Sequence, residues 1–247
     1  MATFTSLLNT LPDPNNGIAD AGQSGTTKGP GYAGVKLSSE HTVSNTRTNS
    51  GRLISRESAG HKWNISISYN PLTRDEFEPV YTFLLQKRGS LTPFFVSLPQ
   101  YKAPRDSNFA TFVANNTVNN AATTETAAGL TNLMVEASGF STVSNGSAKP
   151  GDIFTISDDS HDIRHTKAYQ VTRVETHDDY EANTTRPDSD QQRIHFIPAL
   201  QRSVSSSATL VFNDPKFRVI MKKDIQQYDL NTENLYSFSL ELEEAQP

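Results

Sequence analysis

Residues 68–101 read SYNPLTRDEFEPVYTFLLQKRGSLTPFFVSLPQY, and this stretch decides the fold. Its middle predicts a helix over about residues 73–88. Thr73 is a good N-cap, and Glu76 stands three residues later, so the two residues form a capping box that satisfies free backbone N–H groups. Apolar residues then recur at the spacing that gives a helix one apolar face, at Phe77, Val80, Tyr81, Leu84 and Leu85. The helix should therefore cover one side of a sheet.

The end of this helix is also marked. Lys87 and Arg88 complement the negative C-terminal end, and Gly89 can adopt the left-handed conformation that closes a helix. Pro79 is the one conflict, because it removes a backbone hydrogen bond. We expect it to kink the helix or to shift its regular start.

Strands are predicted on both sides of the helix. Residues 35–69 have a β pattern that ends in strict alternation, with polar residues between Trp63, Ile65, Ile67 and Tyr69. Period two with one polar face indicates an antiparallel strand over a core. The segment 92–99, TPFFVSLP, predicts the next strand, and the helix connects the two.

The chain changes character over residues 102–214. Loop-like sequence comes first, and then short β segments recur between turn residues, which is typical of a small barrel or sandwich. We interpret 102–214 as an inserted β-barrel-like domain. Residues 35–101 and 215–247 then form the main β-sandwich domain, whose last strand, near 236–243, should be half buried with an acidic outer face.

The first 34 residues form a separate segment in this interpretation. Residues 12–34 are rich in Pro and Gly and poor in apolar groups. They are either a loose loop or part of an extended N-terminal arm, 1–34, that orders only against a neighbouring subunit.

Composition excludes several classes of protein. The 247 residues are 35% hydrophobic and 20% charged, with a net charge of −5, which argues against a protein that grips phosphate backbones. The chain has no cysteine, so a disulfide, a thiol nucleophile and a cysteine-ligated metal are excluded. No apolar run reaches membrane-spanning length and the N-terminus lacks the pattern of a signal peptide, so no membrane partner is expected.

Candidate chemistry is sparse. The only dense set of possible metal ligands lies in a segment that looks like turn and strand, and we interpret it as a polar loop; it contains His161, His165, His177, His195, Asp158, Asp159, Asp162, Asp178 and Asp179. No nucleophile elbow, Walker A motif or dinucleotide fingerprint occurs. We expect no catalytic residues, no metal and no cofactor.

The order of these elements carries a resemblance. Four elements in this order resemble distal-tail and minor-tail proteins of tailed bacteriophages. They are the alternating strand Trp63–Tyr69, the helix with Phe83, Leu84 and Gly89, the aromatic strand with Phe94 and Phe95 that closes at Pro99, and the final LYSFSLELEEA of 235–245. The middle segment is similar to β-barrel modules inserted into longer tail and baseplate proteins.

The resemblance implies a tail-tube-like fold, namely a two-sheet antiparallel sandwich with one flanking helix. It implies a structural, non-enzymatic virion protein, made in the host cytoplasm, that forms a hexameric ring at the distal end of a tail or at the junction of tail tube and baseplate. Its partners would be copies of itself, the tail tube protein and a baseplate hub or tape-measure protein. DNA would pass through the lumen without specific binding.

Two alternatives stay open. The chain could be a carbohydrate-binding or host-receptor-binding β-module of a virion that uses loops of the inserted domain. It could also be a glycosidase or esterase whose acidic residues are scattered along the sequence.

Overall fold

The computed structural model describes residues 10–16, 28–137, 139, 141–158, 167–177, 187–206 and 208–245. It is mainly β, with antiparallel sheets and a small closed barrel, which confirms the predicted fold class. The chain divides into two compact units. Residues 9–95 and 218–246 form one, which we call the sheet unit, and residues 96–217 carry the barrel of the other, the barrel unit. The sequence had suggested boundaries at 101/102 and 214/215.

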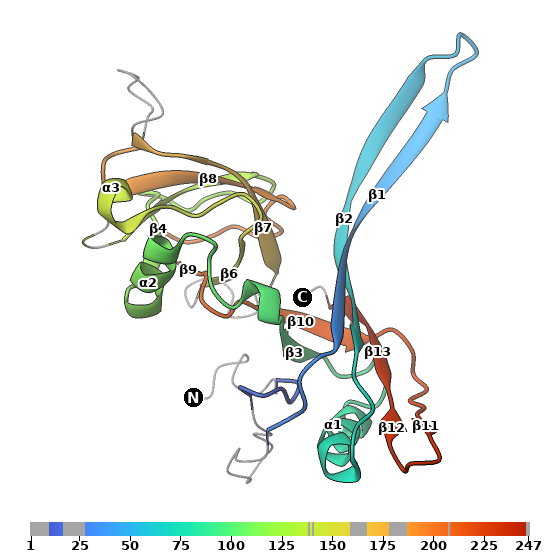
Figure 1. The fold of residues 1–247 in the computed structure, drawn as a ribbon. Coiled ribbons are helices and arrows are strands. Elements are labelled where there is room, and N and C mark those ends of the chain that lie inside the picture. Colours follow the sequence, from blue (N-terminus) through green and yellow to red (C-terminus); the bar gives the residue numbers. More distant parts are fainter. Residues whose placement is uncertain are drawn as a thin grey trace. The chain divides into compact units, whose positions relative to one another are not determined.

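The sheet unit is built on five strands in the order β1-β2-β13-β10-β3 (Figure 1). Their bounds are β1 Gly34–Arg47, β2 Leu53–Ser68, β13 Ser239–Glu244, β10 Lys216–Met221 and β3 Phe94–Ser97. Strand β2 pairs antiparallel with both β1 and β13. A second, two-stranded sheet joins β11 Asp229–Leu230 to β12 Tyr236–Ser237.

One face of the sheet is apolar, as the alternation predicts. Trp63, Ile65 and Ile67 of β2 are at most 3% exposed, and Leu240 and Leu242 continue the same face on β13. Helix α1, Arg74–Gln86, covers this face. The apolar side of the helix and the apolar side of the sheet remove each other from water, which stabilises both.

The residues predicted for the helix cap lie at its N-terminus. The backbone N and the Oγ1 of Thr73 both donate to Glu76 Oε2, at 3.0 and 2.8 Å. Both hydrogen bonds lower the pKa of Glu76, and the one from the backbone N of Thr73 has the larger effect. The helix starts at Arg74 and runs through Pro79, so the expected shift of its start is wrong.

The predicted apolar stripe is partly corrected. Phe77, Val80 and Leu84 are buried and Tyr81 is half-buried, but Leu85 is 51% exposed. Phe83 is buried instead and packs edge-on against Phe94, with ring centroids 5.5 Å apart. The stripe is therefore rotated by part of a turn, because the sheet contributes an aromatic partner on that side.

Lys87 is the C-cap of α1 and Arg88, with φ +54°, takes the left-handed position after it, so the position expected for Gly89 is wrong by one residue. Gly89 follows Arg88 in the turn and is under two constraints. Its φ is +69°, and an added Cβ would lie 2.5 Å from Asp224 Oδ1 and 3.0 Å from Asp224 Cα. The same carboxylate accepts from the backbone N and the hydroxyl of Ser90, which lowers its pKa. Gly89 thus permits both the left-handed turn and the close approach of the loop after β10.

We expect Gly89→Ala to destabilise the protein by about 2–4 kcal/mol, because it adds a steric clash to backbone strain of about 1–2 kcal/mol. Gly51→Ala is the matched control, since Gly51 also has a positive φ, of 81°, but has nothing within 4 Å of an added Cβ. Urea unfolding of both variants measures the difference. Equal effects at the two positions would show that the contact with Asp224 is unimportant.

The barrel unit contains a closed six-stranded barrel in the order β4-β5-β8-β7-β6-β9. The strands are β4 Val118–Asn120, β5 Asn132–Glu136, β8 Gln191–Ile197, β7 Ala168–Glu175, β6 Ile153–Ser157 and β9 Thr209–Val211. Phe154, Tyr169 and Phe196 fill its centre with rings 5.2–5.6 Å apart. A closed barrel has no free strand edge, so the barrel itself needs no partner to complete it.

The segments 101–109 and 113–129 look loop-like in the sequence, but this interpretation is wrong for part of them, where the structure has a helix and strand β4. Helix α2, Ser107–Asn115, lies here, and the described chain also has the short helix α3, Thr142–Asn145, and a 3-10 turn, Pro99–Tyr101. Asp106 caps α2, and Phe109 and Phe112 anchor it in the barrel core. Phe109, Phe112 and Val113 stand at helical spacing, but they span little more than one turn, so the pattern was too short to stand out from its Ala/Thr/Asn-rich surroundings.

Candidate functional site

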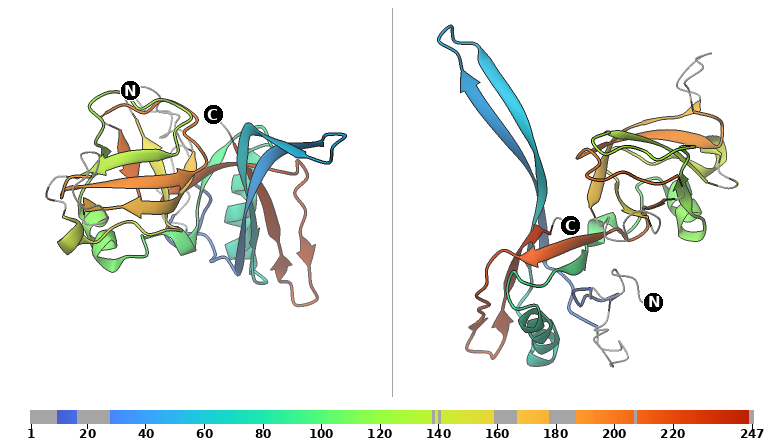
Figure 2. Two further views of the ribbon diagram at one scale, coloured as in Figure 1. Left: turned by 90° about the horizontal axis from the view of Figure 1, so that it is seen from above. Right: turned by 180° about the vertical axis from the view of Figure 1, so that it is seen from behind.

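The most unusual feature of the sheet unit is the far end of the β1–β2 hairpin, residues 42–58, which we call the ribbon. Strand β13 pairs with β2 only from Asn64 to Ser68. Beyond that point the two strands continue alone and project from the sheet, as the views in Figures 1 and 2 agree. An isolated two-stranded ribbon is at best marginally stable in water.

The ribbon leaves the sheet at a bulge. The partners change from Glu40↔Lys62 to Thr42↔Ser58, so β2 has two more residues than β1 between these pairs. Extra residues in one strand bend and twist a ladder. Next to the bulge His41 and His61 pack edge to face, with ring centroids 4.7 Å apart, and the Nε2 atoms of both lie 3.1 and 2.9 Å from Ser39 Oγ.

The two outer edges of the five-stranded sheet differ. At β3 the N-terminal segment covers the edge, because Leu11 N donates to Phe95 O at 2.7 Å and Thr10 forms a parallel bridge with Phe95. At the opposite edge, no described strand pairs with the outer side of β1. Bare strand edges present a row of unpaired backbone groups that can pair with another chain.

The hydrogen-bond register identifies the outward groups of β1. Tyr69 N donates to Phe238 O, which makes the odd-numbered residues of β2 the ones that bond to β13. The even-numbered residues of β2 therefore bond to β1, where their partners are also even-numbered. It follows that the backbone N–H and C=O groups of Val35, Leu37 and Ser39 point away from the sheet.

The sheet face opposite α1 is polar and balanced in charge. Lys62 Nζ lies 2.6 Å from Glu243 Oε1, and Lys223 Nζ lies 2.9 Å from Glu241 Oε2. The hydrogen bond to Glu243 raises the pKa of Lys62, and the negative charge of Glu243 raises it further. The predicted acidic outer face of the last strand is thus present, but lysines from neighbouring elements neutralise it.

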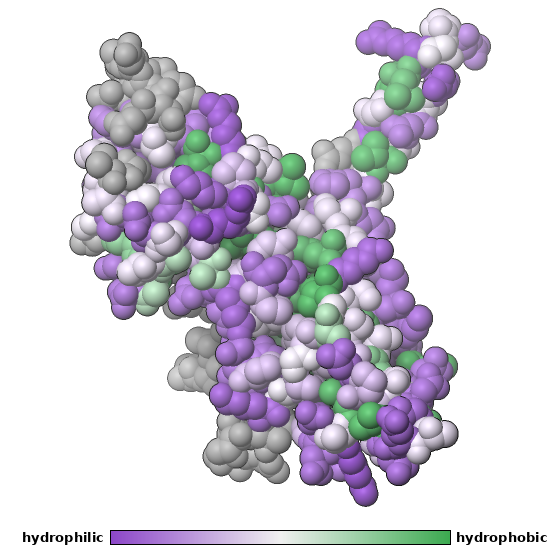
Figure 3. Space-filling model, viewed as in Figure 1, coloured by the Kyte–Doolittle hydropathy of each residue, from purple (hydrophilic) through white to green (hydrophobic). Residues whose placement is uncertain are grey.

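The ribbon itself is exposed on both faces. Val43, Leu53 and Ile54 are 48%, 55% and 53% exposed. Figure 3 shows small hydrophobic areas among hydrophilic ones along the ribbon. Cross-strand pairs place Val43 and Leu53 on one face and Ile54 on the other. The ribbon therefore contributes nothing to the core of its own unit, although it carries apolar groups.

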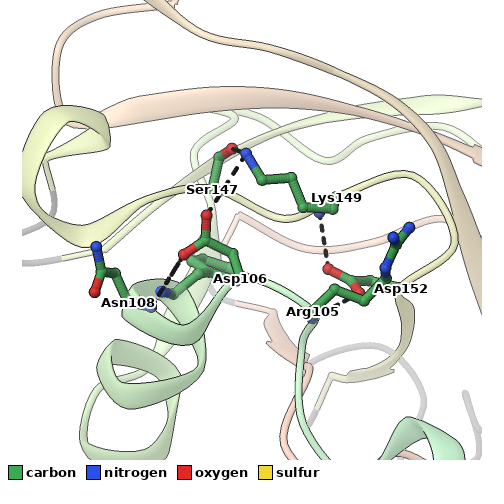
Figure 4. A network of polar contacts seen from close by, with 7 residues as sticks. Arg105, Asp106, Asn108, Ser147, Lys149 and Asp152 are labelled. Carbon is green, nitrogen blue, oxygen red and sulfur yellow. Dashed lines mark hydrogen bonds and ion pairs between the residues drawn. The ribbon is translucent and has the colours of Figure 1, made fainter.

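A second candidate is a polar network in the barrel unit (Figure 4). Asp152 accepts hydrogen bonds from the backbone N of Arg105, at 3.0 Å, and of Lys149, at 2.8 Å. Lys149 Nζ lies 3.5 Å from Asp106 Oδ2. These residues border an open hollow of about 610 Å³ lined by Arg105, Asp106, Ser107, Asn108, Lys149 and Pro150. Each acidic group has an internal partner, so the arrangement is explained by the cap of α2 and the turn before β6.

Asp106 lets this explanation be tested. Its Oδ1 accepts from the backbone N of Asn108 and Phe109 at 3.0 and 3.1 Å. Burial alone would raise the pKa of Asp106, but these hydrogen bonds and the charge of Lys149 together lower it. Because its pKa is lower in the folded protein, ionised Asp106 stabilises the fold at any pH above its pKa in the unfolded chain, about 3.9. This contribution disappears as the pH falls through the pKa of Asp106 in the folded protein.

We expect Asp106→Ala to cost about 1 kcal/mol at pH 7, because α2 loses its cap, and to cost progressively less as the pH falls below about 3.9. Asp106→Asn keeps a capping oxygen and should cost less than Asp106→Ala at pH 7. Thermal unfolding between pH 3 and 7 compares the three proteins. A penalty for Asp106→Ala that does not change with pH would contradict the role of the charge.

The predicted metal-ligand set lies largely outside the described residues. His161, His165, Asp159, Asp162, Asp178 and Asp179 are in that part. The members that are described lie apart from one another in different contacts: Asp158 accepts from Ser205 N and Oγ at 2.7 Å, His177 contacts Pro187 O, and His195 contacts Glu175. The described residues contain no group of three or more potential metal ligands.

The helix residues singled out in the sequence do not lie at the candidate site. They hold α1 on the sheet, whereas the ribbon and the bare edge of β1 were missed. One signal could have found the ribbon: between Ser38 and Ser58 the chain keeps strand-forming residues and yet has no apolar face. Among the described residues, no helix is both long and apolar enough to span a membrane.

No protein-family model matches the chain, and no curated protein sequence matches it.

Proposed function

We propose that this chain is a structural protein that assembles into a closed ring by pairing the bare strand edges of neighbouring copies. One observation carries the proposal: among the described residues, no strand pairs with either outer edge of the ribbon or with the outer edge of β1 below it, and the described apolar side chains of the ribbon are exposed. A soluble protein normally shortens, charges or covers such an edge. Here the edge runs the full length of a 14-residue strand.

The geometry of the hairpin permits the head-to-tail pairing that a ring requires. Strands β1 and β2 are antiparallel, so β1 of one copy can pair antiparallel with the free part of β2 in the next copy. The contact is head-to-tail around the ring, and a closed cycle leaves no edge exposed. The β3 edge is covered by the chain's own residues, so the pairing has one donor edge and one acceptor edge per copy.

The polar sheet face supports the role suggested by the resemblance to phage tail proteins. Its lysines and glutamates form ion pairs with each other and are separated by Ser66, Ser68 and Ser239. A surface of this kind gives a passing polyanion no strong, fixed attachment point. We therefore propose a ring at the distal end of a phage tail, or at the tube–baseplate junction, with this face toward the DNA channel. The tube protein and a hub or tape-measure protein would be its neighbours in the virion.

Light scattering coupled to size-exclusion chromatography tests the proposal. We expect a closed oligomer, with the six copies that the resemblance suggests, and ring-shaped particles in negative-stain electron micrographs. A protein that remains a single copy at all concentrations up to about 100 µM, both alone and with tail tube protein, would contradict it.

The receptor-binding alternative makes a different demand. It requires a ligand at the barrel unit, where the hollow beside α2 is the described candidate. That alternative would be favoured if a glycan binds the wild type, if changing Arg105 and Lys149 abolishes this binding, and if the protein forms no ring.

A further inference from the structure

The sheet unit has opposite charges at its two ends. The ribbon carries Arg47, Arg52 and Arg56 against one acidic residue, Glu57. Its net charge is therefore +2 in a chain whose total is −5, so the remainder carries −7. All three arginines are exposed, and none makes an ion pair or side-chain hydrogen bond with another described residue.

The other end of the unit is acidic. Helix α1 begins there beside the β11–β12 hairpin, at the end opposite the ribbon in both side views (Figures 1 and 2). Stacking of Phe77 on Tyr236, with centroids 4.5 Å apart, fixes the helix against this hairpin. Asp75, Asp229 and Glu233 are exposed here, and their carboxylates make no ion pair or hydrogen bond with another described residue.

Both ends also expose apolar groups. At the acidic end Tyr228 is 45% and Leu230 is 52% exposed, next to Asp229. On the ribbon Leu53 and Ile54 follow Arg52 directly and are exposed to a similar extent. Each end therefore combines unpartnered charge of one sign with apolar side chains that would lose contact with water in a complex.

We propose that the ribbon of one copy docks on the acidic end of a second copy. Three unpaired arginines meet three unpaired carboxylates, and the aliphatic groups at the tip of the ribbon meet Tyr228 and Leu230. Because the two surfaces lie at opposite ends of the same unit, the contact is heterologous and repeats. It would join ring to ring along the axis.

This inference rests on the proposed self-assembly, but it uses the side chains of the ribbon where the ring uses its backbone edges, so the two contacts depend on different forces. Pairing of strand edges depends on backbone hydrogen bonds and changes little with salt. The ribbon–acidic-end contact depends on exposed charges, which salt screens over about 10 Å at 0.1 M and about 3 Å at 1 M. We therefore expect stacked rings at 50 mM salt that separate into single rings at 1 M salt.

A charge exchange between two variants tests the partner. Variant A carries Arg47→Glu, Arg52→Glu and Arg56→Glu, and variant B carries Asp75→Arg, Asp229→Arg and Glu233→Arg. Each variant alone should form rings but no stacks, because like charges then face each other. An equimolar mixture should stack again, since each ribbon meets the opposite charge on the other variant. The matched control is a third variant, whose rings should still stack. It carries Lys28→Glu, Lys102→Glu and Lys222→Glu.

The possible outcomes separate the claims. Rings that never stack at low salt, or a mixture of A and B that does not stack, would overturn this inference and leave the ring intact. Loss of rings at every salt concentration would overturn the proposed function instead. A 30-base-pair DNA duplex that binds the wild type and not variant A, with no restacking in the mixture, would assign the ribbon to nucleic acid and overturn the proposal.

Discussion

Phe77→Asp should prevent the sheet unit from folding. Phe77 is 3% exposed and lies at the centre of a ring cluster with Tyr81, Tyr228, Tyr236 and Phe238, at centroid distances of 4.5–5.6 Å. Removing a buried Phe costs about 3–5 kcal/mol, and an unpaired buried carboxylate adds several more. The sum is comparable with the whole stability of a typical domain, about 5–15 kcal/mol.

The control for this variant lies on the opposite side of the same helix. Thr82 is exposed, so Thr82→Asp introduces the same charge into water and should cost less than about 1 kcal/mol. Circular dichroism and urea unfolding compare the two variants. A Phe77→Asp protein that unfolds at the wild-type urea concentration would show that α1 does not pack on the sheet as described.

Shortening the ribbon should abolish assembly and leave the fold intact. In this variant an Asn-Gly turn replaces residues 43–57 and joins Thr42 to Ser58, which are paired in the native ladder. The deleted segment buries none of its described apolar side chains, so the melting temperature of the single copy should stay within about 5 °C of wild type. Light scattering should then find single copies where the wild type forms rings.

A second variant separates backbone pairing from side-chain contact. Val43, Leu53 and Ile54 changed to Thr keep the length of the ribbon, its strand propensity and both edges. This protein should still form rings, because the proposed contact uses main-chain groups. If the shortened protein of the previous experiment forms the same rings as the wild type, the ribbon plays no part in assembly.

The fold was predictable where the pattern was long and periodic. The capping residues Thr73 and Glu76, the apolar positions of α1 and the alternation from Trp63 to Tyr69 each constrain a local structure. Their combination therefore indicated a helix packed on a sheet. Helix α2 was not predicted, because it is only nine residues long and its apolar positions, Phe109, Phe112 and Val113, span little more than one turn.

The candidate site was not predictable in the same way. The β pattern of residues 35–69 predicts strands here, but without an apolar face over residues 42–58 it does not indicate that the two strands leave the sheet as a free ribbon. The bare edge of β1 is a property of the sheet order, which depends on β13 and β10 joining from the far end of the chain. The charge contrast between Arg52 and Asp229 likewise becomes visible only when the two ends of the unit are placed in space.

Amide hydrogen exchange at single-residue resolution tests the central claim, that copies pair through their bare edges, most directly. The amides of Val35, Leu37 and Ser39 point outward, whereas those of Lys36 and Ser38 bond to β2 within one copy. In rings, compared with the shortened protein, the outward amides should exchange at least about tenfold more slowly, which corresponds to 1.4 kcal/mol of pairing, and the inward amides should change little. Rings in which Val35, Leu37 and Ser39 exchange as fast as in single copies would contradict the account.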